Sequence, residues 1–321
     1  MTVERSSSPT EVASAQAGAM PRASKVRWSR WSPQLALLPA VAITLVAFIG
    51  AIFWTIWLSF TRSRRFPEYE IDWSEWARQY DRLFRDNGWE ISLKNLVILG
   101  VGSMLAIVFG FILAAMIDRE KRGEGFFRTV FLYPLAVSLI VTGVAWRWMF
   151  NPSLGVEHFL HSIGLTFISF NWLSSGETAM YGIILASIWQ GSGFYMALML
   201  AGLKSINTEI WSAARLDGVS FWRLYIEIII PMMKFTFLTC AILLSLGVVK
   251  AYDIVVAMTN GGPGQSTWVP AYFTINAYWA KSNLGYASAA AVIMLLITAA
   301  IFLPLVLLTA WRERAREART A

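Results

Sequence analysis

Long apolar segments occupy nearly half of this chain, and they limit the folds that it can adopt. Six stretches are long and apolar enough to cross a membrane, near residues 34–60, 93–117, 128–150, 178–203, 232–257 and 284–310. A helix needs about 20 such residues to cross roughly 30 Å of hydrocarbon. The mean hydropathy of +0.53 and the hydrophobic content of 56% also exceed those of ordinary soluble domains. We therefore expect an all-α membrane protein with six transmembrane helices.

Basic residues are distributed unevenly among the segments between these spans. On one side, four segments carry four or five of them each, at residues 1–33, 118–128, 204–234 and 312–321. On the other side, residues 151–177 carry none and residues 258–283 carry only Lys281. Because short loops rich in Lys and Arg stay in the cytoplasm, we expect both termini to be cytoplasmic.

The first outer segment, residues 61–92, departs from this pattern. It carries six arginines, and three of them, Arg62, Arg64 and Arg65, lie close to the first span. Seven acidic residues between Glu68 and Glu90 accompany them, but acidic residues have little effect on orientation. The segment is also rich in aromatic residues, so it could form a small amphipathic cap at the membrane surface.

The chain divides into three parts by composition. Residues 1–33 are polar, basic and rich in Ser, Ala and Pro, and we expect a disordered cytoplasmic tail there. A signal peptide is the competing interpretation, but the apolar run that follows is too long for a signal core. Residues 34–310 would form the transmembrane domain, including a cytoplasmic loop at 204–231, and residues 311–321 a second cytoplasmic tail.

No pattern in the sequence points to an enzyme, a metal site or a bound cofactor. His158 and His161 lie three residues apart, but no third ligand is evident beyond Glu157. The single cysteine, Cys240, lies in an apolar run and predicts a buried hydrophobic side chain. The net charge of +7 could suggest nucleic acid, but the basic residues cluster beside the spans, as they do in membrane proteins. There is also no ATP-binding loop, so the chain would not hydrolyse ATP itself.

The segment from Asn207 to Pro231 is the most informative loop. Its first part predicts a short helix that ends at Asp217-Gly218, because glycine adopts the left-handed conformation that terminates helices. A second helix would follow, with apolar residues on one side at Phe221, Leu224, Tyr225 and Ile228. Pro231 marks where the chain turns toward the membrane, since proline kinks a helix that it enters.

This segment resembles the coupling loop of permease subunits in binding-protein-dependent ABC importers. The family signature is Glu-Ala-Ala, then Asp-Gly two residues on, then Ile-x-Leu-Pro. The matching positions here are Ala213, Ala214, Asp217, Gly218, Ile228, Ile230 and Pro231. Ser212 stands where the signature has the Glu that pairs with a basic group on the ATPase, and Glu209, one turn earlier, could replace it. The resemblance implies docking on the ATPase through Ala213–Ala214, the Gly218 turn and Phe221 or Trp222.

Two further resemblances favour a carbohydrate. The run Asn-Gly-Gly-Pro-Gly at residues 260–264, followed by Thr267, is similar to an outer turn of sugar permeases in this family. Aligned through the Asp-Gly turn, the positions that fall on the sugar contacts of maltose-type permeases are Ser187, Gln190, Gly191 and Phe194.

The fourth and fifth spans would together form the substrate pathway. We expect Gly191-Ser192-Gly193 to break the fourth span, where Tyr195 adds an aromatic ring. In the fifth span the corresponding residues, Leu244, Gly247 and Ala251, have no polar side-chain group, so recognition there would use the backbone, Lys250 or Tyr252. Lys250 and Asp253, three apart on one expected helix, would either pair or line the cavity. The alternative for the aromatic residues is simple packing between helices.

The resemblance implies a type I ABC importer permease that takes up a sugar across the inner membrane of a bacterium or archaeon. Its partners would be a second, similar permease subunit, two ATP-binding subunits and an extracytoplasmic sugar-binding protein. Nucleic acid is not expected as a partner. The competing hypothesis is an ion-coupled secondary transporter, which would require inverted repeats and intramembrane carboxylates. Asp253 is one candidate carboxylate, and no convincing repeat is visible.

The predicted orientation can be tested with single-cysteine reporters. In intact cells, a cysteine at Ser174 should react with a membrane-impermeant thiol reagent, because residues 151–177 are expected outside. A cysteine at Ser205 should react only after the membrane is permeabilised. Labelling of position 205 in intact cells would contradict both the orientation and the cytoplasmic position of the loop at 207–231.

Overall fold

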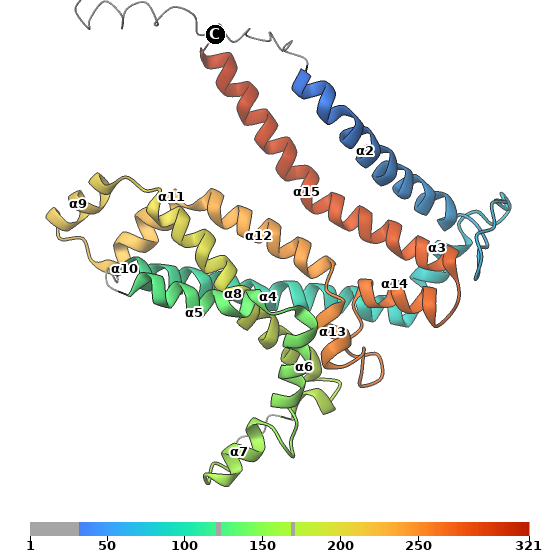
Figure 1. Ribbon diagram of the computed structural model, residues 1–321, viewed down its shortest axis with the longest axis horizontal. Coiled ribbons are helices and arrows are strands. Elements are labelled where there is room, and N and C mark those ends of the chain that lie inside the picture. The colour runs from blue at the N-terminus through green and yellow to red at the C-terminus, as the bar shows by residue number, and fades with distance from the viewer. Residues whose placement is uncertain (1–31, 120–122, 168–170, 321) are drawn as a thin grey trace, which may run out of the picture. The chain divides into compact units, whose positions relative to one another are not determined.

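The computed structural model describes residues 32–119, 123–167 and 171–320, which contain helices and no strands (Figure 1). Contacts divide the chain into two units, Met1–Ile52 and Phe53–Ala321. Of the first unit, the structure describes only the part of α2 that begins at Ser32. Residues 1–31, which make up nearly all of the expected tail at 1–33, lie outside the described residues. The long helices are α2 (Ser32–Ser59), α4 (Asn87–Arg119), α8 (Ala179–Lys204), α12 (Lys234–Val249) and α15 (Leu284–Thr320).

The shorter helices connect these five. Before the middle of the chain they are α3 (Arg78–Phe84), α5 (Glu124–Ala136), α6 (Leu139–Met149) and α7 (Val156–Ser162), with a 3-10 turn at Trp172–Ser174. After α8 they are α9 (Thr208–Leu216), α10 (Phe221–Arg223), the π-helical turn η2 (Leu224–Ile229), α11 (Ile230–Met232), α13 (Asp253–Met258) and α14 (Pro270–Trp279).

Within the described part of the chain, four helices are long and apolar enough to cross a membrane. They contain Leu37–Ser59, Asn87–Arg119, Ala179–Lys204 and Leu284–Leu303. Two bent pairs bring the number to six, the first joining Glu124–Ala136 to Leu139–Met149 and the second joining Phe221–Met232 to Lys234–Val249. The expected all-α fold with six spans is confirmed on this count. The helix of the last span continues beyond the expected end at residue 310, because α15 runs to Thr320.

The third expected span, residues 128–150, is not one helix. The chain bends by 95° between α5 and α6, which Figure 1 shows turning away from α5. Val137 adopts an extended conformation at the end of α5, three residues after Pro134. Ser138 then begins a new helix, because its hydroxyl accepts a hydrogen bond from the Val141 amide at 3.3 Å. The bend therefore follows from a proline near one helix end and a capping serine at the next.

Two other expectations about the spans are wrong. Gly191-Ser192-Gly193 does not break the fourth span, because α8 is continuous from Ala179 to Lys204. Gly193 instead allows a close approach, since a Cβ atom at this position would overlap the Phe131 carbonyl oxygen of α5. The fifth span is interrupted, because α12 ends at Val249 and α13 begins at Asp253. Lys250 and Asp253 are therefore not on one helix.

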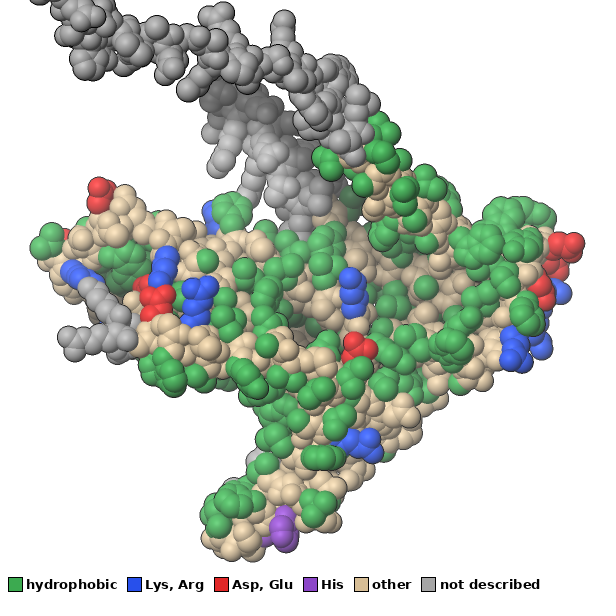
Figure 2. Space-filling view, in the orientation of Figure 1, with side chains coloured by type: hydrophobic (Ala, Val, Ile, Leu, Met, Phe, Trp, Pro, Cys, Tyr) green, Lys and Arg blue, Asp and Glu red, His purple; other side chains and the backbone are tan. Residues whose placement is uncertain are grey.

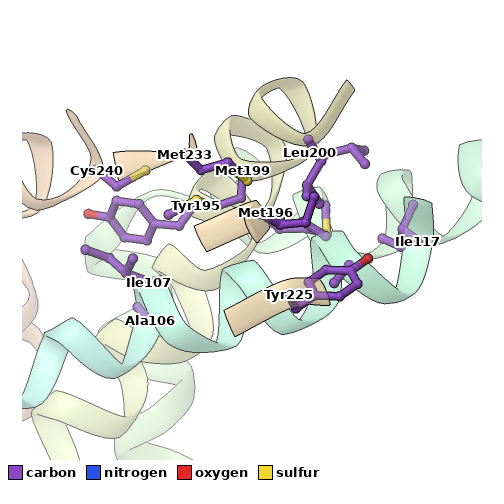
Figure 3. Packing of buried hydrophobic residues seen from close by; sticks show 14 of the residues in the cluster. Ala106, Ile107, Ile117, Tyr195, Met196, Met199, Leu200, Tyr225, Met233 and Cys240 are labelled. Atoms are coloured by element: carbon purple, nitrogen blue, oxygen red, sulfur yellow. The ribbon is translucent and has the colours of Figure 1, made fainter. Parts of the chain in front are cut away.

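The main core of the second unit lies where α8 crosses α4. A Cβ atom on Gly110 of α4 would lie 2.7 Å from the Met196 amide nitrogen, so only glycine permits this crossing distance. Figure 3 shows the Tyr195 ring of α8 beside Ile107 of α4 and Cys240 of α12, all of which belong to one buried cluster with Met196. Cys240 is fully buried, as its apolar surroundings in the sequence predict.

The segment at residues 61–86 is joined by hydrogen bonds to the beginning of α15. The amides of Leu284 and Gly285 donate to the Arg64 and Ser63 carbonyl oxygens at 2.9 and 2.8 Å. Asp86 accepts hydrogen bonds from the Tyr286 hydroxyl at 2.7 Å and from Lys281 at 3.3 Å. Burial raises the pKa of the Asp86 carboxyl, but these two contacts, together with a hydrogen bond from the Gly88 amide, outweigh it and hold the pKa below its ordinary value.

Candidate functional site

A cavity of about 600 Å³ lies in the second unit, at the two points where the spans are broken. All eight residues predicted for the substrate pathway line it, namely Ser187, Gln190, Gly191, Phe194, Tyr195, Gly247, Lys250 and Tyr252. Its wall is formed by the long helices α4, α8 and α12 and by the shorter helices α5, α6 and α13. The structure thus brings all of the residues predicted for the substrate pathway together around one cavity.

The sequence interpretation missed part of this wall. The residues not predicted are Leu99, Ser103, Ala106, Leu135, Val137, Leu139, Val248 and Ile254, with Leu244 and Ala251 noted only for their lack of polar groups. Val137 belongs to the bend between α5 and α6, for which Pro134 was the available signal. Ser103 is a small polar residue in an apolar run, and nothing in the sequence distinguishes it from a packing serine.

Gln190 is the polar residue that connects the cavity to the broken backbone. Its Nε2 atom donates to the Val137 carbonyl oxygen at 2.8 Å, at the point where α5 ends. This carbonyl has no continuing helix to bond to, and an unpaired backbone group is costly in hydrocarbon. The Gln190 side chain is only 7% exposed, and its Oε1 atom is buried without a hydrogen-bond partner in the described part of the protein. Gln190 thus stabilises the bend and keeps one acceptor unused.

The other polar groups of the wall differ in how far they are engaged. The Ser187 hydroxyl donates to the Ile183 carbonyl of its own helix at 2.8 Å. Lys250 and Asp253 are exposed to the cavity, and among the described residues neither forms an ion pair. The alternative in which these two residues pair with each other is therefore wrong, and the alternative in which they line the cavity is confirmed.

The aromatic residues of the wall take part in packing as well. Tyr195 is buried in the main core and contacts Phe194, with ring centroids 5.4 Å apart. Tyr252 stacks on Tyr272 with centroids 6.2 Å apart. The wall is therefore mostly apolar, with amide, hydroxyl and charged groups at a few points, which is typical of sites for small molecules. An apolar ring face beside hydrogen-bonding groups suits a sugar, which has both kinds of surface.

The second part of the candidate site is the segment at residues 207–231. Asn207 begins α9 by accepting a hydrogen bond from the Glu209 amide at 3.1 Å. At the other end, Gly218 has φ = 64°, the amide of Gly218 donates to Arg215 and that of Val219 to Ala214. These are the two hydrogen bonds of a Schellman motif, so the predicted Asp-Gly termination of the helix is confirmed. A Cβ atom on Gly218 would meet nothing within 4 Å, and the positive φ alone requires glycine.

Most residues predicted to dock on a partner lie on the surface of this segment. The exposed ones are Glu209, Ser212, Ala213, Asp217, Gly218 and Pro231. Ala214 is buried, so it lies on the face of α9 that packs against the rest of the protein. Ser212 donates to the Thr208 carbonyl at 3.0 Å, and the Glu209 carboxylate accepts from the Asn207 side chain at 3.1 Å.

The apolar residues of the segment separate into an inner and an outer group. Phe221 packs on Tyr225 with centroids 4.5 Å apart, and the Arg119 guanidinium lies 4.5 Å from its ring. Phe221 therefore attaches the segment to α4. Trp222 and Leu216 are 72% and 89% exposed. The sequence interpretation missed Leu216, because the residue before an Asp-Gly turn has no special pattern.

The predicted turn at Pro231 lies within a longer change of direction. Pro231 occupies one of the first two positions of α11, where a missing amide hydrogen is tolerated. The chain then bends by 69° between Met232 and Lys234. The chain therefore changes direction close to Pro231, with the helix break at Met233. His158 and His161 lie on α7, and within the described residues no group of three His, Cys, Asp or Glu side chains could hold a metal ion.

The sequence profile of the family described as "Binding-protein-dependent transport system inner membrane component" matches residues 106–317. A probable ABC transporter permease of Pyrococcus horikoshii is 38% identical over 276 residues, which cover 84% of this chain and 92% of that protein. The trehalose/maltose transport system permease protein MalF of Thermococcus litoralis is 29% identical over 253 residues, 78% of this chain and 83% of that protein.

A similar structure supports the fold. The crystal structure of a bacterial ABC transporter involved in the import of the acidic polysaccharide alginate contains a chain that matches with a TM-score of 0.73. The match covers 85% of this chain and 93% of that chain at 20% sequence identity. The fold expected from the sequence, that of a type I importer permease, is thereby confirmed.

The contact between Gln190 and Val137 can be tested by its effect on stability. Gln190→Ala removes the donor and leaves the Val137 carbonyl unpaired, which should lower the free energy of unfolding by about 1–3 kcal/mol. Ser187→Ala, in the same helix and the same cavity wall, removes a hydroxyl that bonds only to its own helix and should have a much smaller effect. The measurement is thermal unfolding of the purified protein in detergent. Equal stability of the two variants would contradict the role of Gln190 at the bend.

Proposed function

The chain belongs to the family of binding-protein-dependent transport system inner membrane components, and we propose that it forms the sugar-conducting permease subunit of an ATP-driven ABC importer. The observation that carries the sugar hypothesis is the cavity at the broken spans, with its mixture of aromatic rings and hydrogen-bonding groups. The relative from Thermococcus litoralis, whose name refers to trehalose and maltose, supports the same substrate class.

In this proposal, the cavity holds the sugar in transit. Gln190 would offer its unused Oε1 acceptor to a sugar hydroxyl, because a buried acceptor without a partner gains from such a bond. Phe194 or Tyr252 would lie against the apolar face of the ring. Lys250 and Asp253, each without an ion-pair partner among the described residues, remain free to hydrogen-bond further hydroxyls.

The segment at residues 207–231 would connect this cavity to the ATPase. The exposed face of α9 and the Gly218 turn would dock in a groove of an ATP-binding subunit. Phe221 and Tyr225 would transmit the movement, since both pack against the end of α4 and the main core. The bend at Met233 leads from this segment directly into α12, which lines the cavity. A rigid lever of this kind allows ATP-driven closure to change access to the cavity.

The partners proposed for this subunit follow from the same mechanism. They are two ATP-binding subunits, an extracytoplasmic sugar-binding protein and a second permease subunit. In the apolar stretches of α4 and α15 only 28% of the residues are buried inside the described structure, so apolar faces remain for lipid and for a second permease. The protein is a multi-pass protein of the inner membrane, and we propose that both termini face the cytoplasm. The ion-coupled alternative is not supported, because the family depends on a binding protein.

Substitutions in the loop test the proposed coupling. Gly218→Val forces a branched side chain into the left-handed region, which costs about 1–3 kcal/mol at a site that must fit closely. We expect it to abolish sugar-stimulated ATPase activity in the reconstituted complex. Ser212→Ala should be mild, because the exposed Ser212 hydroxyl bonds only to its own helix, and even the ion pair of the family's Glu would contribute only ~0.2–1 kcal/mol. Glu209→Ala should reduce activity more than Ser212→Ala if Glu209 replaces the signature carboxylate.

Two controls make this test specific. Gly218→Asn should retain coupling, because Asn tolerates the left-handed conformation. Gly125→Val adds the same side chain to α5, where a Cβ atom would also meet nothing within 4 Å and φ is not positive. If Gly218→Val stays fully coupled while the complex assembles, the loop does not transmit ATPase movement.

A further inference from the structure

The six arginines of residues 61–92 are not explained by orientation or by the transport mechanism. In the expected orientation they lie on the side of the membrane where the other loops carry almost no basic residues, which indicates a specific function for them. In the structure, four of these arginines surround a polar cavity of about 410 Å³. The complete lining is Arg62, Arg64, Arg78, Gln79, Arg82 and Asn283.

The arginines of this cavity are only partly neutralised. Arg62 donates to Asp72 at 2.6 Å and to Glu75 at 2.8 Å, and Arg78 donates to Glu75 at 3.0 Å. Among the residues that the structure describes, Arg64 and Arg82 have no carboxylate partner.

Other contacts hold these two arginines in place. The Arg82 guanidinium lies 4.7 Å from the centre of the Tyr286 ring, which positions the side chain without removing its charge. The backbone of Arg64 accepts a hydrogen bond from the Leu284 amide at 2.9 Å. The cavity is therefore lined by one guanidinium held against an aromatic ring and by a second whose backbone is anchored, and no acidic residue lines its wall.

An apolar hollow of about 340 Å³ belongs to the same part of the chain. It is lined by Phe53, Ile56, Trp57, Phe60, Ile71, Trp73 and Trp76. Residues of the two linings are close along the chain, because Phe60 of the hollow lies two residues before Arg62 of the cavity. The two acceptors of Arg62, Asp72 and Glu75, also immediately precede Trp73 and Trp76 of the hollow. Figure 2 shows basic side chains close to hydrophobic ones at the end of the molecule that carries α3.

The arginine cavity and the hollow lie close to the end of the first span, and this position favours a lipid as the ligand. The first candidate span ends at Ser59, and Arg62 follows within three residues, at most about 10 Å of extended chain. Tryptophan and arginine at such a point lie at the level of the lipid headgroups. Guanidinium groups bind phosphate in a bidentate manner, and aromatic side chains pack on acyl chains. An acidic surface of a protein would occupy the arginines but would leave the hollow without a ligand.

We propose that the arginine cavity and the adjoining hollow bind one anionic phospholipid, with its phosphate between Arg64 and Arg82 and an acyl chain against Trp73. The site is separate from the sugar cavity and from the ATPase loop. Lipid bound there would attach the segment at residues 61–86, and through it the beginning of α15, to the membrane surface.

The test uses the full chain in its assembled complex, with the affinity for added phosphatidylglycerol measured by native mass spectrometry and phosphatidylcholine as the reference lipid. Wild type should prefer phosphatidylglycerol. Because each arginine near an anionic membrane contributes about fivefold in affinity, Arg64→Gln with Arg82→Gln should weaken phosphatidylglycerol binding roughly thirtyfold. Arg65→Gln with Arg85→Gln removes the same charge from the same segment outside the cavity and should leave the affinity unchanged.

A second pair of variants distinguishes a lipid from free phosphate. Trp73→Ala should weaken phosphatidylglycerol binding, whereas Phe66→Ala, at an equally exposed aromatic residue outside the hollow, should not. The lipid proposal would be overturned if inorganic phosphate competes with phosphatidylglycerol and Trp73→Ala leaves the affinity for phosphatidylglycerol unchanged. That result would show a site for free phosphate. Equal binding of the two lipids by wild type, or equal losses in the two double variants, would overturn it as well. Co-elution of the other subunits with each variant shows that the complex has assembled.

Discussion

The constraint on which this structure depends is that backbone polar groups in hydrocarbon must be paired. Two of the expected spans depart from continuous helix, at residues 137–138 and 250–252, and the cavity of about 600 Å³ lies where these departures meet. The bond from Gln190 to the Val137 carbonyl shows how one freed group is satisfied from a neighbouring helix. Irregular backbone is tolerated only beside protein or a polar space, and these breaks have both, in Gln190 and in the cavity that they line.

The proposed coupling depends on a different kind of constraint. Gly218 has open space around it and is required only by its backbone angle, so the shape of the loop is set by one residue that packs on nothing. Phe221 and Tyr225 fix the same loop to α4 and α8 through buried aromatic contacts. The loop thus combines an exposed turn, whose shape is set by Gly218, with aromatic residues that pack on the core. That combination suits a lever, because force applied at the surface reaches the core instead of deforming the loop.

The sequence predicted the features that depend on local chemistry. Apolar length gave the spans, and the Asp-Gly pair gave the Schellman turn, because each is determined by the residues themselves. Gly191-Ser192-Gly193 was misread as a break, since glycine in a membrane helix also serves close packing, here against the Phe131 carbonyl. The break at residues 250–252 has the sequence Lys-Ala-Tyr, which contains neither Gly nor Pro, so tertiary contacts must determine it.

The candidate residues of the cavity were found by a different route. The resemblance to maltose-type permeases selected Ser187, Gln190, Gly191 and Phe194, and the structure places them on one wall. The resemblance could not show that the Gln190 side-chain amide donates a hydrogen bond to the Val137 carbonyl, because that contact joins residues far apart in the sequence. The exposure of Leu216 also depends on tertiary structure. Sequence therefore indicated which residues gather, and the structure shows which of their polar groups are still unused.

The measurement that tests the account most directly is access to the cavity in different nucleotide states. In a Cys240→Ala background, a cysteine at Ser187 would be labelled in proteoliposomes by a membrane-impermeant thiol reagent added to one side or the other. If the chain is an alternating-access permease, labelling should occur from the cytoplasmic side without nucleotide and from the outer side in the ATP-bound complex. Labelling from the same side in both states would contradict a cavity whose access is controlled by ATP.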